Sequence, residues 1–298
     1  MEGAYLMLKA NDITIRDPYI LLYEDKYYMY GTRSHLSWEK PKDINTQGFD
    51  VYISDDLENW SEPVEIFKRP DDFWATLNFW APEVHHYRGA FYLFATFWSE
   101  NRCRGTQVLV AKHPTGPFHV HSPEPITPPA WECLDGTLYV AKNGTPYMVF
   151  CHEWVQIEEG TICAIELTPD LKDSVGEPFE LINAANPSWA DGDGGRGRYV
   201  TDGPCFYRTK TNALLMFWSS LKDGNYVEAI SISDNGEIDG MWTTYDELLY
   251  EEDGGHGMAF KSKEGDLYFT LHAPNVNYNE HPVFLRIEDS GDRVVRLD

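Results

Sequence analysis

Three aspartates and a histidine occupy matching places in this sequence, each at the start of a stretch rich in Val, Leu, Tyr and Phe. They are Asp17 in RDPYI, Asp135 in LDGTLYV, Asp202 in TDGPCFY and His256 in GGHGMAF, and the fifth matching place, in WAPEV, holds Ala81. Carboxylates that are brought together repel one another, which shifts their pKa values apart and suits them to proton transfer. A single aspartate often caps a turn, but three aligned aspartates and a histidine favour a shared chemical task.

These residues belong to a pattern that the chain repeats five times. Each copy is a strand, a short turn and a second strand, as in RDPYILLYEDKYYMYGT from Arg16 and WAPEVHHYRGAFYLFAT from Trp80. Further copies begin at Leu134, Thr201 and Gly255. Another strand follows four of the copies, and FLRIEDSGDRVVRLD at the C-terminus is its expected fifth version. Each unit therefore supplies at least three strands, with room for a fourth.

Units of this kind predict an all-β fold, a five-bladed β-propeller with four-stranded blades around a central channel. Helical solenoids have shorter repeats with a period of about 3.6 residues, which this chain lacks. We expect a single domain over residues 1–298. The innermost strand of each propeller blade lines the channel, so the residues that open these strands are expected to meet at one of its ends.

Composition limits the classes of partner. The net charge of −24, from 48 acidic and 24 basic residues, disfavours nucleic acid and anionic membranes and favours a neutral ligand such as a sugar. No apolar run approaches the ~20 residues of a membrane span. The five cysteines form no CxxC pair and are expected to be free thiols. Together with the lack of a recognisable signal peptide, they favour a cytoplasmic location.

In this order, the segments RDPYI, WAPEV, LDGTLYV, TDGPCFYRT and GGHGMAF resemble glycoside hydrolase family 43, the five-bladed arabinosidases and xylosidases, over residues 12–275. The resemblance implies inverting hydrolysis by three carboxylates at one end of the channel. Asp17 matches the general base that activates water, and Asp135 matches the residue that tunes the pKa of the proton donor. Asp202 stands where the family usually has a glutamate as general acid. Because Asp is one methylene shorter, Glu153 in FCHEW is an alternative proton donor.

The resemblance implies a polysaccharide-degrading enzyme that acts on arabinofuranosyl-containing oligo- or polysaccharides, as an α-L-arabinofuranosidase or arabinanase does. A β-xylosidase or a β-galactofuranosidase would use the same machinery. A non-catalytic sugar-binding propeller is the alternative from another class, and the aspartate at position 202 motivates it.

Aromatic residues near the expected active end could stack on the C–H faces of sugar rings. They are Phe79, Trp80, Trp98, Trp131 and Trp154. By resemblance, His256 matches a channel histidine that is associated with a calcium ion and its water shell. A histidine packed by hydrogen bonds is an equally simple interpretation, because calcium prefers oxygen ligands. No cofactor is required by the expected chemistry.

Overall fold

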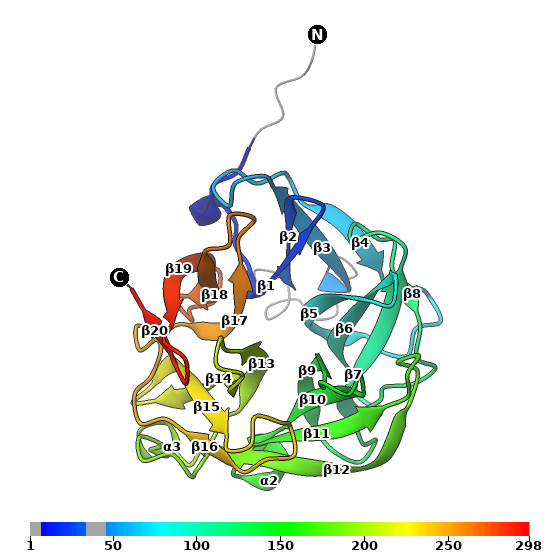
Figure 1. Ribbon diagram of the computed structural model, residues 1–298. Helices are drawn as coiled ribbons and strands as arrows, with labels where there is room; N and C mark the ends of the chain where they lie inside the picture. The colour runs from blue at the N-terminus through cyan, green and yellow to red at the C-terminus, as the bar shows by residue number, and fades with distance from the viewer. Residues whose placement is uncertain (1–6, 34–45, 298) are drawn as a thin grey trace.

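The computed structural model describes residues 7–33 and 46–297, and strands dominate it. Five antiparallel sheets of four strands each follow one another along the chain and stand around a central axis (Figure 1). The predicted five-bladed propeller with four-stranded blades is therefore confirmed. The single-domain expectation for 1–298 stays a prediction, and residues 1–6, 34–45 and 298 lie outside the described residues.

Each blade uses four consecutive strands, and the first of them is the innermost. The strands of blades 1 and 2 are β1 (Arg16–Tyr23), β2 (Lys26–Thr32), β3 (Gly48–Ser54), β4 (Val64–Lys68), β5 (Leu77–Tyr87), β6 (Ala90–Ser99), β7 (Arg102–Ala111) and β8 (His119–Val120). Those of blade 3 are β9 (Cys133–Val140), β10 (Pro146–His152), β11 (Thr161–Leu167) and β12 (Ser174–Asn183). Those of blades 4 and 5 are β13 (Asp202–Arg208), β14 (Leu214–Lys222), β15 (Asn225–Ser233), β16 (Trp242–Thr244), β17 (Gly255–Lys261), β18 (Leu267–Ala273), β19 (His281–Asp289) and β20 (Val294–Arg296).

Helices in the described residues are short: η1 (Ala10–Asp12), α2 (Trp154–Ile157) and α3 (Gly192–Gly195). None of the helices within 7–33 and 46–297 is long and apolar enough to cross a membrane. All five cysteines are free, as their spacing predicted.

The hydrophobic core lies between neighbouring blades rather than within one of them. Phe49 and Phe67 of blade 1 pack with Phe79 and Phe97 of blade 2, with ring centroids 5.9–6.4 Å apart between the blades. Strands that are buried on both faces read as continuous apolar runs, and the first five residues of β14, LLMFW, are of this kind. Blade-to-blade packing of this type fixes the five inner strands around the channel.

The ring does not close within one of the described sheets, because each contains only consecutive strands. Ile13 and Ile15, which precede β1, are buried with Trp60 against Met258 and Phe260 of blade 5. The backbone N–H of Ile15 donates to the carbonyl oxygen of Glu280 at 3.1 Å. The Trp60 ring also stacks on Phe284, with centroids 5.9 Å apart. The first and last blades are thus joined by a hydrophobic contact and a few hydrogen bonds.

Candidate active site

All five inner strands begin with the same irregularity. Near its start, each pairs with its second strand and then inserts one extra residue, a β-bulge. The residue just after that pair has a φ of 45–56°, the left-handed region that L-residues other than glycine occupy at a cost of about 1–2 kcal/mol. These five bulge residues are Asp17, Ala81, Asp135, Gly203 and His256.

This register corrects the sequence alignment in blade 4. Asp202 pairs with Ser219, as Arg16 pairs with Thr32 and Trp80 with Thr96, so Asp202 lies one position before the bulge. The bulge residue of blade 4 is Gly203. A Cβ at Gly203 would stand only 2.6 Å from the His256 ring, so no other residue fits there without displacing that ring. Asp202 therefore does not share the position of Asp17 and Asp135.

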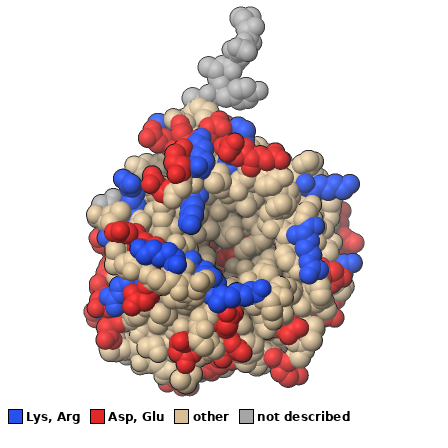
Figure 2. Space-filling model, viewed as in Figure 1, with Lys and Arg blue, Asp and Glu red and all other residues tan. Residues whose placement is uncertain are grey.

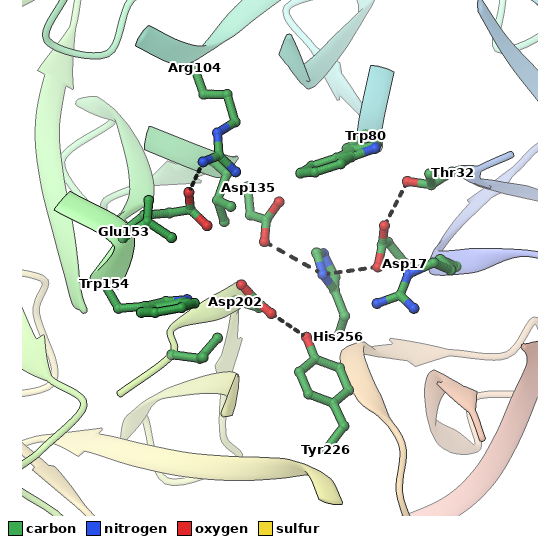
Figure 3. A pocket seen from close by; sticks show the side chains of 14 residues that line it. Asp17, Thr32, Trp80, Arg104, Asp135, Glu153, Trp154, Asp202, Tyr226 and His256 are labelled. Atoms are coloured by element: carbon green, nitrogen blue, oxygen red, sulfur yellow. Dashed lines mark hydrogen bonds and ion pairs between the residues drawn. The ribbon is translucent and has the colours of Figure 1, made fainter. Parts of the chain in front are cut away.

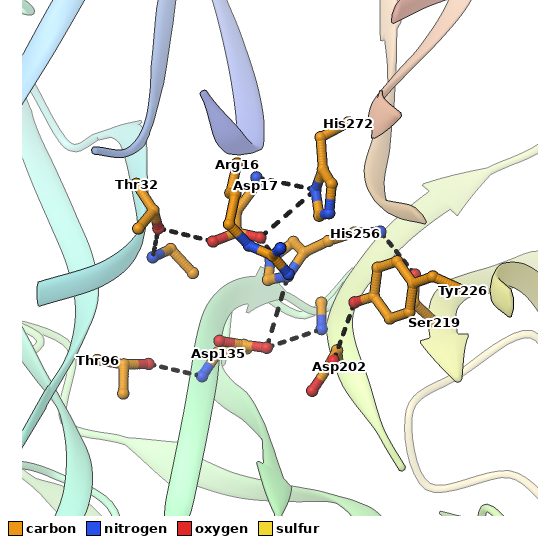
Figure 4. A network of polar contacts seen from close by, with 12 residues as sticks. Arg16, Asp17, Thr32, Thr96, Asp135, Asp202, Ser219, Tyr226, His256 and His272 are labelled. Carbon is orange, nitrogen blue, oxygen red and sulfur yellow. Dashed lines mark hydrogen bonds and ion pairs between the residues drawn. The ribbon is translucent and has the colours of Figure 1, made fainter. Parts of the chain in front are cut away.

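The backbone N–H of every bulge residue is held by a side chain of the preceding blade. For the bulge residues of blades 1, 2, 3 and 5, the acceptor is on the second strand of the blade before. It is the residue of that strand that pairs with the first strand just before the bulge. In blade 4, the N–H of Gly203 donates instead to Oδ2 of Asp135 at 3.1 Å. The acceptors for Asp17, Ala81, Asp135 and His256 are, in order, His272 Nδ1 at 3.1 Å, Thr32 Oγ1 at 2.7 Å, Thr96 Oγ1 at 2.8 Å and Ser219 Oγ at 2.6 Å (Figure 4).

A cavity of about 340 Å³ opens where these strands begin. Figure 3 looks into it, with the carboxylates on different blades facing one another around His256. The blades run clockwise in Figure 1 and anticlockwise in Figure 3, so the two figures view opposite faces of the propeller. The lining residues include Arg16, Asp17, Thr32, Trp80, Arg104, Asp135, Glu153, Trp154, Asp202, Tyr226 and His256.

Asp17 is built to stay ionised. Burial alone would raise its pKa, but His256, Arg16 and His272 and a hydrogen bond from Thr32 hold the pKa of Asp17 below its usual value. Thr32 Oγ1 donates to Asp17 Oδ2 at 2.6 Å, and His256 Nδ1 lies 3.2 Å from Asp17 Oδ1. An ionised carboxylate at a cavity wall is the form that a general base requires.

Asp135 and His256 form the floor of the cavity. Burial raises the pKa of Asp135 well above its usual value, and Asp202 and Asp17 raise it further against the opposing effect of His256. Nδ1 of His256 lies 3.6 Å from Oδ2 of Asp135. Burial alone would lower the pKa of His256, but Asp17, Asp135 and Asp202 raise it to about 9. The floor therefore carries an imidazolium at neutral pH.

Asp202 differs from Asp17 in the direction of its pKa shift. Burial raises the pKa of Asp202, although His256 and a hydrogen bond from Tyr226 oppose the shift. The Tyr226 hydroxyl donates to Asp202 Oδ2 at 2.9 Å. Because its pKa is raised while that of Asp17 is lowered, Asp202 is the better proton donor of the two.

Glu153 lies at the same cavity, at the N-terminus of α2. Burial raises its pKa to about 7 despite the nearby Arg104. Nη2 of Arg104 stands 2.6 Å from Glu153 Oε2 in an ion pair, without the alignment of a hydrogen bond. Arg104 also donates from its backbone and from Nε to Glu132. The structure thus places both sequence-predicted donors, Asp202 and Glu153, in one cavity.

Two of the five predicted sugar-stacking residues line the cavity and three do not. Trp80 and Trp154 line it from blades 2 and 3 (Figure 3). Phe79 was predicted wrongly: it is 3% exposed and packs in the core, because adjacent residues of a strand point to opposite faces. Trp98, at the end of β6, is also absent from the lining. Trp131 stacks instead on His152, with centroids 4.3 Å apart.

Sequence reasoning missed four lining residues that hold the acids: Arg16, Thr32, Arg104 and Tyr226. Arg16 directly precedes Asp17, and its Nη1 donates to Glu280 Oε1 at 2.9 Å and to Asn275 Oδ1 at 2.8 Å. Its place within RDPYI was the one available signal. Thr32, Arg104 and Tyr226 lie on second and third strands, where no motif marks them.

The site does not fit a directly bound metal ion. No group of three or more His, Cys, Asp or Glu side chains in the described part of the chain is arranged to hold one. The carboxylates of Asp17 and Asp135 face Nδ1 of His256 as ion-pair partners. They do not form the set of six or more oxygen atoms around one point that calcium prefers. The water-linked calcium implied by resemblance stays a prediction, and no step below depends on it.

A β-propeller with carboxylates of unlike pKa at the channel mouth is a glycosidase arrangement, and comparisons with known proteins agree. The model of "Glycosyl hydrolases family 43" matches residues 12–292, so this chain belongs to glycoside hydrolase family 43 and is a glycosidase. None of the curated proteins compared with the chain matches it.

Solved structures share the fold over nearly the whole chain. An endo-arabinase from Bacteroides thetaiotaomicron VPI-5482 is 36% identical, with a TM-score of 0.85 over 96% of this chain and 98% of that one. An endo-1,4-beta-xylanase from the same organism is 26% identical, with a TM-score of 0.78 over 98% and 97%. An exo-1,5-alpha-L-arabinanase from a bovine ruminal metagenomic library is 18% identical, with a TM-score of 0.67 over 100% of both chains, which shows the fold alone.

Proposed function

We propose that this glycosidase hydrolyses α-L-arabinofuranosyl bonds of arabinan-type saccharides with inversion at the anomeric carbon. The observation that carries the proposal is the opposite shift of two pKa values at one cavity, lowered for Asp17 and raised for Asp202. The resemblance to the endo-arabinase, at 36% identity, favours arabinofuranosyl substrates over the xylosyl and galactofuranosyl alternatives.

In the proposed reaction, Asp17 accepts a proton from a water molecule as the water oxygen bonds to the anomeric carbon. The bond between that carbon and the glycosidic oxygen breaks, and Asp202 gives its proton to the departing oxygen. Inverting enzymes hold these two carboxyl groups roughly 6.5–9.5 Å apart, which leaves room for the water. Asp17 and Asp202 belong to blades 1 and 4, on opposite sides of His256 in Figure 3.

Asp135 has a positioning role in this scheme. Its Oδ2 accepts the N–H of Gly203, the residue that follows Asp202, so Asp135 holds the backbone that carries the proton donor. Burial, and then the nearby Asp202 and Asp17, raise its own pKa. Asp135 and Asp202 are therefore expected to titrate as a coupled pair. Trp80 and Trp154 supply the apolar faces on which a neutral sugar ring can pack.

The test compares Asp17→Asn, Asp202→Asn and Glu153→Gln on linear arabinan and on an aryl α-L-arabinofuranoside with a good leaving group. We expect Asp17→Asn to lose at least about a thousandfold in kcat/KM on both substrates. Asp202→Asn should lose about a hundredfold or more on arabinan but far less on the aryl glycoside, whose leaving group needs little protonation. NMR of the first-formed sugar should show the inverted anomer.

Other results would redirect the proposal. If Glu153→Gln shows the leaving-group dependence and Asp202→Asn does not, Glu153 is the proton donor. Full activity of Asp17→Asn would overturn the assignment of the base. Turnover of an aryl β-D-xyloside in preference to the arabinofuranoside would contradict the proposed sugar while leaving the family assignment intact.

A further inference from the structure

A second cavity opens at the other end of the central channel. Its volume is about 390 Å³, within the range of roughly 300–1,000 Å³ usual for small-molecule sites. All five inner strands contribute to its wall at positions beyond the bulge, that is, farther from the catalytic mouth. Figure 2 views this opposite face and shows a hollow at its centre. The main lining residues are Tyr19, His85, Tyr139, Phe206, Arg208 and Met258.

Basic side chains stand on the rim of this hollow, although the chain as a whole carries a charge of −24. Each of the five inner hairpins has an exposed Lys or Arg in or next to its turn, and Figure 2 shows blue side chains gathered around the hollow. Lys26 pairs with Asp55 at 2.8 Å, whereas Arg88 and Lys263 donate to backbone carbonyl oxygens. Exposed acidic residues of the same hairpins, Glu24, Asp25 and Glu264, offset part of this charge. The five basic residues are Lys26, Arg88, Lys142, Lys210 and Lys263.

Arg208 brings a fixed positive charge into the cavity itself. Its Nη1 donates to the carbonyl oxygens of Gly236 at 2.8 Å and Asn212 at 3.1 Å, and its Nη2 donates to the Tyr139 hydroxyl at 2.7 Å. Among the described residues, the carboxylate that forms an ion pair with Arg208 is Glu237, at 4.0 Å, and it also pairs at 2.7 Å with Lys142. One carboxylate shared by two cations leaves an excess of positive charge.

Aromatic and hydroxyl groups complete the cavity wall. The Tyr139 and Phe206 rings lie 4.7 Å apart and offer apolar faces. Because the Tyr139 oxygen accepts from Arg208, its own proton can be donated to a ligand. Deeper in the channel, the Glu83 carboxylate accepts from Thr137 at 2.5 Å and lies 3.1 Å from His85 Nε2, so its charge is engaged there.

From these contacts we propose that the cavity opposite the catalytic mouth binds an acidic sugar, a uronate residue. Its carboxylate would lie against Arg208 and the basic rim, and its ring against Tyr139 and Phe206. A planar, immobilised guanidinium is well suited to a carboxylate, and aromatic faces suit the C–H face of a pyranose. The catalytic cavity takes a neutral arabinofuranosyl unit under the proposed function, whereas this site takes an anion. The protein would thereby hold an acidic region of a polysaccharide on the face away from the chemistry.

Calorimetric titration of the unaltered protein at low ionic strength with D-glucuronate and with D-glucose tests this directly. The two sugars differ only at the carboxylate. We expect glucuronate to bind at least about tenfold more tightly, as a charge-assisted hydrogen bond implies, and its affinity to fall with added salt. Equal affinity for the two sugars, or no binding of glucuronate, would overturn the proposal.

Variants locate the binding. Arg208→Gln should reduce glucuronate affinity at least about tenfold. Lys172→Gln changes an exposed lysine outside the cavity, so it is the matched charge control and should keep the affinity for glucuronate.

Trp154→Ala alters the catalytic cavity, so loss of glucuronate binding in that variant would place the ligand there and contradict the proposal. Because Arg208 also clamps two backbone carbonyls, Tyr139→Phe is the milder second variant, with an expected loss of about threefold. Arabinan hydrolysis measured on the unaltered protein stays an independent readout.

Discussion

Burial raises the pKa of both Asp17 and Asp202, and His256 and Arg16 lower it at both. At Asp17 these cations, together with His272 and the hydrogen bond from Thr32, outweigh burial. At Asp202 burial prevails, although the Tyr226 hydroxyl also opposes it. Removal of that one hydroxyl should therefore shift the pKa of Asp202 measurably.

Removal of the Tyr226 hydroxyl gives the sharpest test at this scale. Tyr226→Phe deletes the hydrogen bond that stabilises ionised Asp202, so the pKa of Asp202 should rise further. The alkaline limb of the kcat/KM profile, which reports the proton donor of the free enzyme, should then move to higher pH. Tyr207→Phe is the control, because Tyr207 donates to Asp289 away from the cavity lining. An unmoved or lowered alkaline limb would contradict Asp202 as the donor.

At the residue scale, sequence reasoning found the acids but not their relative placement. RDPYI and LDGTLYV mark bulge residues correctly, whereas the aspartate of TDGPCFY lies one residue before its bulge. A sequence alignment matches residue types, whereas the position of a bulge depends on backbone conformation. Glycine adopts the left-handed region more readily than aspartate does, so in blade 4 the bulge falls on the glycine. The same one-residue alternation explains why Trp80 lines the cavity and Phe79 does not.

At the element scale, a residue of β15 helps to fix the position of His256 through a chain of hydrogen bonds. Glu228 is fully buried on this strand, and its Oε2 accepts from Ser219 Oγ at 2.6 Å. Ser219 in turn accepts the N–H of His256. Burial raises the pKa of Glu228 to about 8, although Ser219 and His256 oppose the shift. Glu228 thus stabilises the junction between blades 4 and 5. It is a single glutamate within a buried strand, and no sequence motif indicated its role.

This glutamate should make stability depend on pH. Its pKa is higher in the folded than in the unfolded chain, so it favours folding fully below about pH 4.5, and this contribution is lost as the pH rises through about 8. The Gln of Glu228→Gln cannot ionise, so the variant should lack this fall in stability with rising pH. Its free energy of unfolding at pH 8, compared with that at pH 5, should therefore be higher than in the unaltered protein. Urea unfolding at both pH values measures this, with exposed Glu177→Gln as control. An unchanged difference between the two pH values would show that Glu228 stays unprotonated in the fold.

Strand patterning predicted the elements well, because alternating and continuous apolar runs separated by tight turns are local signals. The hairpin turn of Glu24 and Asp25, both with positive φ, is one such case. The closure of the ring is different in kind. It depends on contacts such as Arg16 with Glu280, which are far apart in the chain and leave no periodic trace.

At the scale of the whole molecule, the closure of the ring includes one of the hydrophobic clusters of the core. Ile15 is 3% exposed and packs in the cluster that joins blades 1 and 5. We expect Ile15→Ala to cost roughly 2–5 kcal/mol, as other buried Ile to Ala changes do. Val295→Ala, on exposed β20, should cost far less. Chemical denaturation of both variants decides the matter, and a loss below about 1 kcal/mol for Ile15→Ala would show that closure depends on the other contacts.

Each of the five bulge residues is held by its own backbone N–H, and only Asp135 among them also anchors another one through its side chain. The side chain of Asp17 is therefore not needed for this anchoring. Asparagine at position 17 would keep the N–H that His272 accepts and nearly the same shape. Such a variant should therefore retain an intact saccharide in the catalytic cavity long enough to be crystallised with it. Because the backbone stays anchored when the general base is removed, the cavity should still bind the substrate without hydrolysing it.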